Sequence, residues 1–214
     1  MNRVNIGCGM APTEGWENFD NSLSIRLAPH RTLVDLLYKF RLISPPQLAY
    51  IEFCRKNNIK WADATKRIPL PDSSVEVLYS SHMLEHLDRT QAFEFLREAR
   101  RVMVPGGIIR IAVPDLEIYV RNYLIKGDAD LFIGSMQISA SQPRTISEKL
   151  RAFFLGTRHH QWMYDRKSLC RTLDSNGFIN SVALPAGDTK ISEPSHLDRF
   201  ERVEESIYVE AFKA

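Results

Sequence analysis

The chain has 214 residues, 44% of them hydrophobic, which is enough for one α/β domain with a substantial core. Its 28 lysines and arginines nearly balance 26 aspartates and glutamates, so the formal charge of +2 gives no general reason to expect a nucleic-acid partner. Three widely spaced cysteines fit neither a disulfide framework nor a paired zinc motif. No apolar run approaches the roughly 20 residues of a membrane span. We therefore expect a cytoplasmic protein that does not span a membrane.

The first half of the chain alternates strand signals with polar loops. Short apolar strands are predicted at 4–6, which runs into Gly7-Cys8-Gly9, and at 16–19, which ends in Asp20. Helical patterns follow at 31–40 and after Ser44-Pro45, so residues 22–58 exceed a plain connection and are interpreted as an insertion. Strands are again expected at 59–62, which ends in Asp63, and at 75–79.

In the second half, a helix is predicted from Asp88, which with Gln91 has the spacing of a capping box. Pro105-Gly106-Gly107 is expected to stop this helix. The β-branched run 108–113 is typical of a strand covered on both faces of a parallel sheet. Residues 115–160 hold helices but little strand signal, including one opened by Thr145 and Glu148, and are interpreted as a lid.

The last part predicts a helix from Asp165 to Asn176, then strands at 178–184 and 206–212. The alternation of strands and helices favours a doubly wound α/β sheet. Because no repeat or linker divides the chain, we expect one domain over residues 1–214 with insertions at 22–58 and 115–160.

Several motifs occur in a characteristic order along the chain. They are Val4-Asn5-Ile6-Gly7-Cys8-Gly9, the strand end at Asp20, Ala62-Asp63-Ala64, the block 77–86, and Val104-Pro105-Gly106-Gly107. Together they resemble the S-adenosylmethionine (SAM) signature of class I methyltransferases, and in particular the methyltransferase type 11 group. The resemblance implies a Rossmann-like, mostly parallel sheet with helical lid insertions and a final antiparallel strand. It also implies SAM as cofactor, S-adenosylhomocysteine as product, and a small-molecule or glycan acceptor.

The resemblance also implies roles for individual residues. Glycines at a strand end let the backbone approach a ligand and expose N–H donors, here toward the methionine carboxylate. Asp20 would accept the ribose hydroxyls, as a carboxylate at the end of a second strand does. Asp63 with the Ala64 backbone would read the adenine edge. The full set of expected cofactor-binding residues is Ile6, Gly7, Cys8, Gly9, Asp20, Asp63, Ala64, Ser80, Ser81 and His82.

Two features depart from a dinucleotide fingerprint. Pro12 stands where a third glycine would be, and Asp20 follows Gly9 by eleven residues instead of about twenty. This spacing argues against NAD. It also predicts that the first helix is shortened or missing, which removes its dipole from the binding of the carboxylate.

Methyl transfer from an activated sulfonium needs alignment and exclusion of water more than a catalytic triad. A hydroxyl or amine acceptor also benefits from a general base, for which His82, His86, His159 and His160 are the candidates. We favour His82, just past a strand end, and His160, at the return from the lid.

The segment from His82 to His86 also matches H-x-x-E-H, the inverted zinc-peptidase motif. That motif needs both histidines on one helical face, whereas here it directly follows a strand. No metal is therefore expected.

Two other functions stay open. One is a SAM-binding module without catalysis. The other is an RNA or protein methyltransferase, although the sequence carries no aromatic-basic RNA-binding pattern. The sequence does not predict the oligomeric state.

Overall fold

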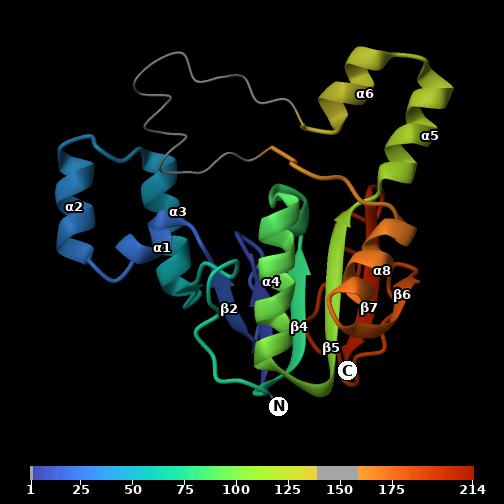
Figure 1. Ribbon diagram of the computed structural model, residues 1–214. Helices are drawn as coiled ribbons and strands as arrows, with labels where there is room; N and C mark the ends of the chain where they lie inside the picture. The colour runs from blue at the N-terminus through green and yellow to red at the C-terminus, as the bar shows by residue number, and fades with distance from the viewer. Residues whose placement is uncertain (1, 139–158) are drawn as a thin grey trace.

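The computed structural model describes residues 2–138 and 159–214, which build a seven-stranded sheet of order β3-β2-β1-β4-β5-β7-β6. Among these strands β7 alone runs opposite to the other six, so its pairings with β5 and β6 are antiparallel and the other described pairings are parallel. The strands are β1 (Arg3–Ile6), β2 (Glu17–Asp20), β3 (Lys60–Trp61), β4 (Val75–Ser81), β5 (Met103–Pro114), β6 (Phe178–Leu184) and β7 (Ser206–Lys213). The predicted Rossmann-like sheet with a final antiparallel strand is confirmed (Figure 1).

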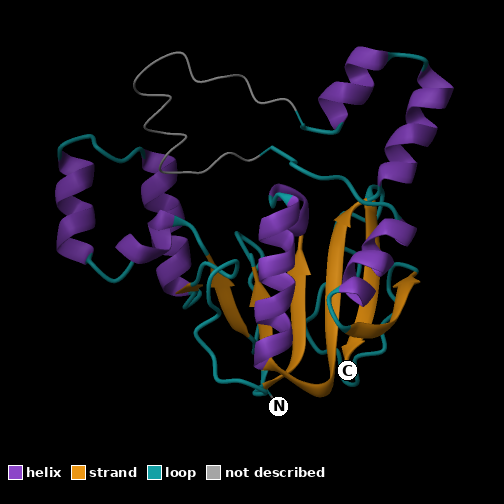
Figure 2. Ribbon diagram, in the orientation of Figure 1, coloured by secondary structure: helices purple, strands orange, loops and turns teal. Residues whose placement is uncertain are grey.

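Most of the described helices surround the carboxyl end and one face of this sheet (Figure 2). They are α1 (Leu23–Leu27), α2 (Arg31–Lys39), α3 (Pro45–Lys56), the 3-10 helix η1 (Leu84–His86), α4 (Arg89–Val102), α5 (Leu116–Lys126), α6 (Ala129–Ser135) and α8 (Arg166–Ser175). The helix predicted from Thr145 and Glu148 lies outside the described residues. Among the described helices, none is long and apolar enough to cross a membrane.

Helix α4 forms where its caps and apolar spacing predict it. Asp88 Oδ1 accepts from the Gln91 backbone N–H at 2.8 Å, and Gln91 Oε1 accepts from the Asp88 N–H at 3.2 Å. Phe95, Leu96 and Ala99 face the sheet and are fully buried in the main core. This packing holds α4 against one face of the sheet beside α8 (Figure 1).

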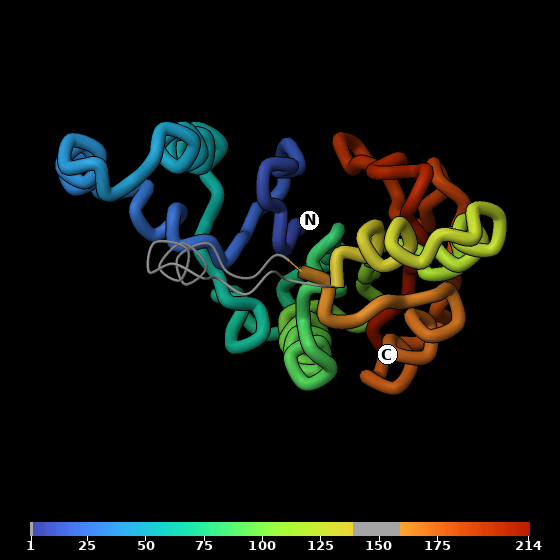
Figure 3. The backbone as a smooth tube through the Cα atoms, turned by 90° about the horizontal axis from the view of Figure 1, so that it is seen from above, coloured from blue at the N-terminus to red at the C-terminus, as the bar shows by residue number. Residues whose placement is uncertain are grey.

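The opposite face of the sheet is packed by irregular chain. Trp16, Ile191 and Leu197 form a buried cluster there with Val77 and Tyr79 of β4. Seen from above, the loops that carry these residues lie on the side of the sheet away from α4 and α8 (Figure 3). Residues 7–16 contain no helix, which confirms the expectation of a missing first helix.

The two expected insertion regions both contain helices. Helices α1 to α3 have a small core of their own, in which Ile25, Val34, Ile51 and Cys54 are buried. Helices α5 and α6 follow the end of β5. These two groups flank the carboxyl end of the sheet on opposite sides (Figure 1).

The interior strand β5 differs from an apolar run at Arg110, which is fully buried. Its Nη1 donates to Glu210 Oε1 of β7 at 2.7 Å, and Arg110 and Glu210 are directly paired in the strand register. The guanidinium also lies 5.0 Å from the ring centre of Tyr208. A buried ion pair therefore joins β5 to the antiparallel strand.

Candidate functional site

Four parallel strands bring the predicted cofactor residues to one edge of the sheet. Strands β3, β2, β1 and β4 are adjacent in this order, so their carboxyl ends meet. The loop 7–9 follows β1, Asp20 ends β2, Asp63 follows β3, and Ser80 and Ser81 end β4. In open α/β sheets, ligands bind in the crevice outside these strand ends.

The two glycines of the first loop have different surroundings. Gly7 has a φ of +74°, and a Cβ placed on it would come within 2.6 Å of Met83 Cγ. Gly9 has a φ of +51°, and a Cβ there would meet nothing within 4 Å among the described atoms. Gly7 thus lets the loop pack on Met83, whereas Gly9 leaves space in which a ligand can approach the backbone.

The expected free N–H donors are not found in this loop. The Gly7 N–H donates to Phe19 O at 2.8 Å and the Cys8 N–H to the same oxygen at 3.2 Å. The Gly9 N–H donates to Asp20 Oδ2 at 3.0 Å. The three N–H groups thus already donate to acceptors of the chain itself. The loop provides space at Gly9 and a hydrogen bond to Asp20, but no free donor for a carboxylate.

Asp20 is held in a fixed orientation at the end of β2. Its Oδ1 accepts from the Ser22 N–H at 2.8 Å, while Oδ2 accepts from Gly9. An ionised carboxylate has about four acceptor positions, so each oxygen keeps capacity for another donor. These remaining acceptor positions fit the two hydroxyls of a ribose, which would donate to them.

Asp63 is likewise fixed by its own loop. Its Oδ1 accepts from the Thr65 hydroxyl at 2.6 Å, and Oδ2 pairs with Lys66 Nζ at 2.9 Å. Burial alone would raise the pKa of Asp63, but the hydrogen bonds from Thr65 and Lys66 outweigh burial and hold the pKa below its usual value. The group is therefore an ionised acceptor beside Ala64.

The side chains or hydroxyl groups of several other predicted cofactor residues are buried at this edge of the sheet. Ile6 is part of the main core, and Cys8 is buried beside Ile25 and Cys54, where burial raises the pKa of its thiol. The hydroxyls of Ser80 and Ser81 are buried and have no hydrogen-bond partner in the part of the chain that the structure describes. Cys8 thus packs as a small apolar side chain, whereas the two serines keep unused polar atoms.

His82 follows β4 directly and has a left-handed backbone, with a φ of +48°. Its N–H donates to Ala112 O at 2.9 Å, which ties this conformation to β5. In the side chain, Nε2 lies 2.9 Å from Ser206 Oγ, and Nδ1 lies 3.3 Å from Glu85 Oε1. The imidazole is thus held between β7 and η1.

The chain at 159–162 is attached to η1 by hydrogen bonds. The Gln161 and Trp162 N–H groups both donate to the Glu85 carbonyl, at 2.7 and 3.2 Å. His86 Nδ1 lies 3.2 Å from the His159 carbonyl oxygen. His160 is buried, and burial lowers the pKa of its imidazole. Three of the four candidate histidines therefore gather around Glu85, while His159 provides its carbonyl.

The peptidase arrangement of the H-x-x-E-H segment is not formed. The segment runs from the end of β4 into a short 3-10 helix, so His82 and His86 do not share one face of an α-helix. Glu85 and His86 are also not first-turn residues of α4, which begins at Arg89. The burial of Glu85 beside His160 is a feature that the sequence did not reveal.

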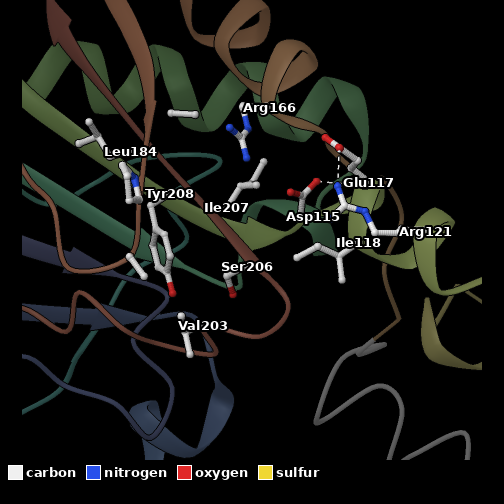
Figure 4. A pocket seen from close by; sticks show the side chains of 13 residues that line it. Asp115, Glu117, Ile118, Arg121, Arg166, Leu184, Val203, Ser206, Ile207 and Tyr208 are labelled. Carbon is white, nitrogen blue, oxygen red and sulfur yellow. Dashed lines mark hydrogen bonds and ion pairs between the residues drawn. The ribbon is translucent and has the colours of Figure 1, made fainter.

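A separate hollow of about 340 Å³ lies between the start of α5 and strands β6 and β7 (Figure 4). Asp115, Arg166 and Tyr208 are among its walls, and Glu117 forms an ion pair with Arg121 at 3.0 Å at one side. Of the described residues that line it, none is a predicted cofactor residue. Ser206 connects the hollow to the site, because its hydroxyl contacts His82.

Comparison with known families and structures agrees with this architecture. Residues 43–111, from α3 into β5, match the family model described as a methyltransferase domain. The strand order with an antiparallel β7 is typical of class I methyltransferases. The described residues thus have the class I methyltransferase fold, and residues 43–111 match a methyltransferase domain.

Two solved structures illustrate how far this likeness extends. A SAM-dependent methyltransferase from Methanosarcina mazei is 15% identical, with a TM-score of 0.52, and the alignment covers 99% of this chain and 92% of the other. The glycopeptide N-methyltransferase MtfA in complex with SAM is 14% identical, with a TM-score of 0.51, over 100% and 81% of the two chains. No curated protein matches the sequence. At these identities the likeness to the solved structures shows a shared fold.

Proposed function

We propose that this methyltransferase transfers the methyl group of SAM to a hydroxyl or amine of a small molecule or glycan. The observation that carries the proposal is the meeting of Asp20, Asp63 and the open space at Gly9 at one sheet edge, next to a buried group of imidazoles. When bound, SAM supplies a methyl group that is already activated for transfer. The chain's own residues then bind, orient and exclude water.

In this proposal the cofactor lies along the ends of β1 to β4. Asp20 accepts the ribose hydroxyls on the lone pairs that Gly9 and Ser22 leave free. Asp63, with the Ala64 backbone, reads the adenine edge. The unpartnered hydroxyls of Ser80 and Ser81 are available at the methionine end, beside His82. Ile6 and Cys8 support the loop by packing.

The acceptor end is assigned to the imidazoles of His82 and His160. Each side chain is almost entirely buried, and an imidazole there accepts a proton from an acceptor hydroxyl or amine as it attacks. A slender acceptor reaches such depth more easily than a folded macromolecular surface does. We further propose that residues 1–214 act as one domain, in which segments 22–58 and 115–160 cover the bound ligands.

The test is to measure binding of SAM and S-adenosylhomocysteine by isothermal titration calorimetry. Asp20→Asn keeps one carbonyl acceptor for the loop but removes the charge, so we expect affinity to fall about 10- to 100-fold, the value of one to two charge-assisted hydrogen bonds. Asp35→Asn is the matched control, because Asp35 is exposed on α2. Equal affinity in wild type and Asp20→Asn, or no binding by the wild type, contradicts the assignment.

A second measurement separates catalysis from binding alone. Transfer of a radiolabelled methyl group from SAM to panels of sugars, glycosides and amines is expected to give a product with at least one acceptor class. Tight binding of SAM without transfer to any of them, but with transfer to RNA or protein, would reassign the acceptor.

A further inference from the structure

A buried cluster of three side chains lies next to the acceptor end of the site. One nitrogen or oxygen from each of Glu85, His86 and His160 lies within 4.8 Å of the other two. Glu85 and His86 belong to η1, whereas His160 comes from a distant part of the chain. The fold thus brings two imidazoles and a carboxylate to one point.

The carboxylate in this cluster has no hydrogen-bond partner in the part of the chain that the structure describes. The side chain of Glu85 is 1% exposed, and neither oxygen accepts a hydrogen bond within residues 2–138 and 159–214. His82 Nδ1, at 3.3 Å, is the only ion-pair contact that the described residues give it. Burial of a carboxylate is costly unless it is paired or coordinates a metal ion. Glu85 is therefore a buried carboxylate whose pairing within the described residues is incomplete.

The two imidazoles are arranged as ligands usually are. A carbonyl oxygen only accepts, so the contact between His86 Nδ1 and His159 O places the proton on Nδ1 and leaves the lone pair on Nε2. Metal-binding histidines commonly donate their other N–H to a backbone carbonyl in this way. His160 Nδ1 is buried and also has no hydrogen-bond partner in the described chain.

The frame around the cluster is rigid. Besides the two bonds to the Glu85 carbonyl, Gln161 Nε2 donates to His86 O at 2.7 Å. The Arg89 guanidinium lies 4.9 Å from the ring of Trp162 and 5.0 Å from that of Phe93, so it clamps the returning chain against α4. Ligands held by such a frame lose little freedom when they bind an ion.

We propose that Glu85, His86 and His160 bind a divalent transition-metal ion such as zinc. Two imidazoles with one carboxylate suit zinc and its neighbours in the periodic table, whereas magnesium and calcium prefer sites built from oxygen. Ligand atoms on a tetrahedral zinc ion are roughly 3.3 Å apart, so small side-chain rotations close the cluster. A three-residue site leaves an open position on the ion.

The open position gives the ion a use in methyl transfer. A bound acceptor hydroxyl loses its proton to a base or to water more readily on a metal ion, and in that case His160 acts as a ligand and not as the base. This use rests on the proposed function, whereas metal binding itself does not. The ligand set also differs from the H-x-x-E-H peptidase motif, because His160 takes the place of His82.

The test uses the full chain after removal of metal with a chelator. Cobalt(II) is titrated and followed by its visible absorption, and zinc is titrated by calorimetry. We expect one ion per chain, and we expect Glu85→Gln and His160→Gln each to weaken binding by at least about 100-fold, since loss of even an outer-shell partner costs 10- to 100-fold. His196→Gln is the matched control, because His196 is exposed and far from the cluster in sequence; it should bind as the wild type does.

Failure to take up either ion overturns the proposal, as does uptake that persists in both variants. If a buried substitution prevents folding, as judged by circular dichroism, His86→Asn replaces it, because His86 is only half-buried. SAM affinity of the metal-free protein is measured in parallel. A protein that binds SAM but no metal contradicts only this inference, and one that binds metal but no SAM contradicts only the proposed function.

Discussion

Glu210 and Glu85 are both buried glutamates, but their surroundings differ. Glu210 on β7 accepts from Arg110 Nη1 at 2.7 Å, the Thr189 hydroxyl at 2.6 Å and the Lys190 N–H at 2.7 Å. Glu85 in η1 accepts no hydrogen bond from the described residues. The first carboxylate lies within the sheet, and the second lies just beyond the end of β4.

The difference shows how to tell a structural buried charge from a functional one. At Glu210, the three donors come from the fold itself, so this carboxylate helps to join the strands and needs no ligand. At Glu85 two N–H groups fix the backbone carbonyl, but the described residues give the carboxylate no donor. An unsatisfied buried group in an otherwise ordered frame marks a position where another molecule or ion can bind.

The largest effect is expected from breaking the structural pair. Arg110→Met leaves Glu210 buried without its counter-charge, so we expect the free energy of unfolding to fall by about 3–5 kcal/mol. Urea denaturation followed by circular dichroism measures it. The double variant Arg110→Met/Glu210→Leu removes both charges and should recover most of the loss. A double variant no more stable than the single one would show that the pair itself is not the source of the effect.

Arg110 also illustrates what the sequence could and could not predict about the fold. The start of α4 followed from a local signal, the Asp88 and Gln91 cap, and is confirmed, whereas Pro105-Gly106-Gly107, expected to stop this helix, lies inside β5. The pairing of Arg110 with Glu210 joins residues on distant strands, and its register depends on how β7 inserts antiparallel beside β5. Local periodicity carries no information about such a register.

The candidate site also has features that the sequence could predict and features that it could not. Asp20 and Asp63 could be placed at one edge because the carboxyl ends of adjacent parallel strands meet there. The use of the Gly7 and Gly9 amides could not, because it depends on the path of the loop over Phe19 and Asp20. The cluster at Glu85 forms only because the segment that carries His160 packs against η1. The two segments are far apart in sequence, so this contact could not be predicted from local patterns.

A smaller effect of opposite sign is expected at the unsatisfied glutamate. Glu85→Gln removes a buried carboxylate that has no donor among the described residues, so the metal-free protein should be as stable as the wild type or more stable, by up to about 2 kcal/mol. Thermal and urea unfolding in the presence of a chelator measure this. Glu117→Gln, at an exposed position on α5, should change stability little. A clear loss of stability in Glu85→Gln would mean that the carboxylate is already satisfied, with His82 as the first candidate partner.

The smallest effect concerns Glu98, a third buried glutamate, which is satisfied but lies closer to solvent. Hydrogen bonds from Arg101 are the main reason that the pKa of Glu98 lies below its usual value of 4.5, and the Ile68 N–H adds to them against the opposing effect of burial. Because the folded pKa is depressed, this stabilisation is fully present above pH 4.5 and is lost as the pH falls through the folded pKa. Glu98→Gln should therefore cost about 1 kcal/mol at pH 7. Wild type and variant should converge in urea unfolding as the pH is lowered below 4.5, whereas a constant difference at every pH would assign the loss to packing instead of charge.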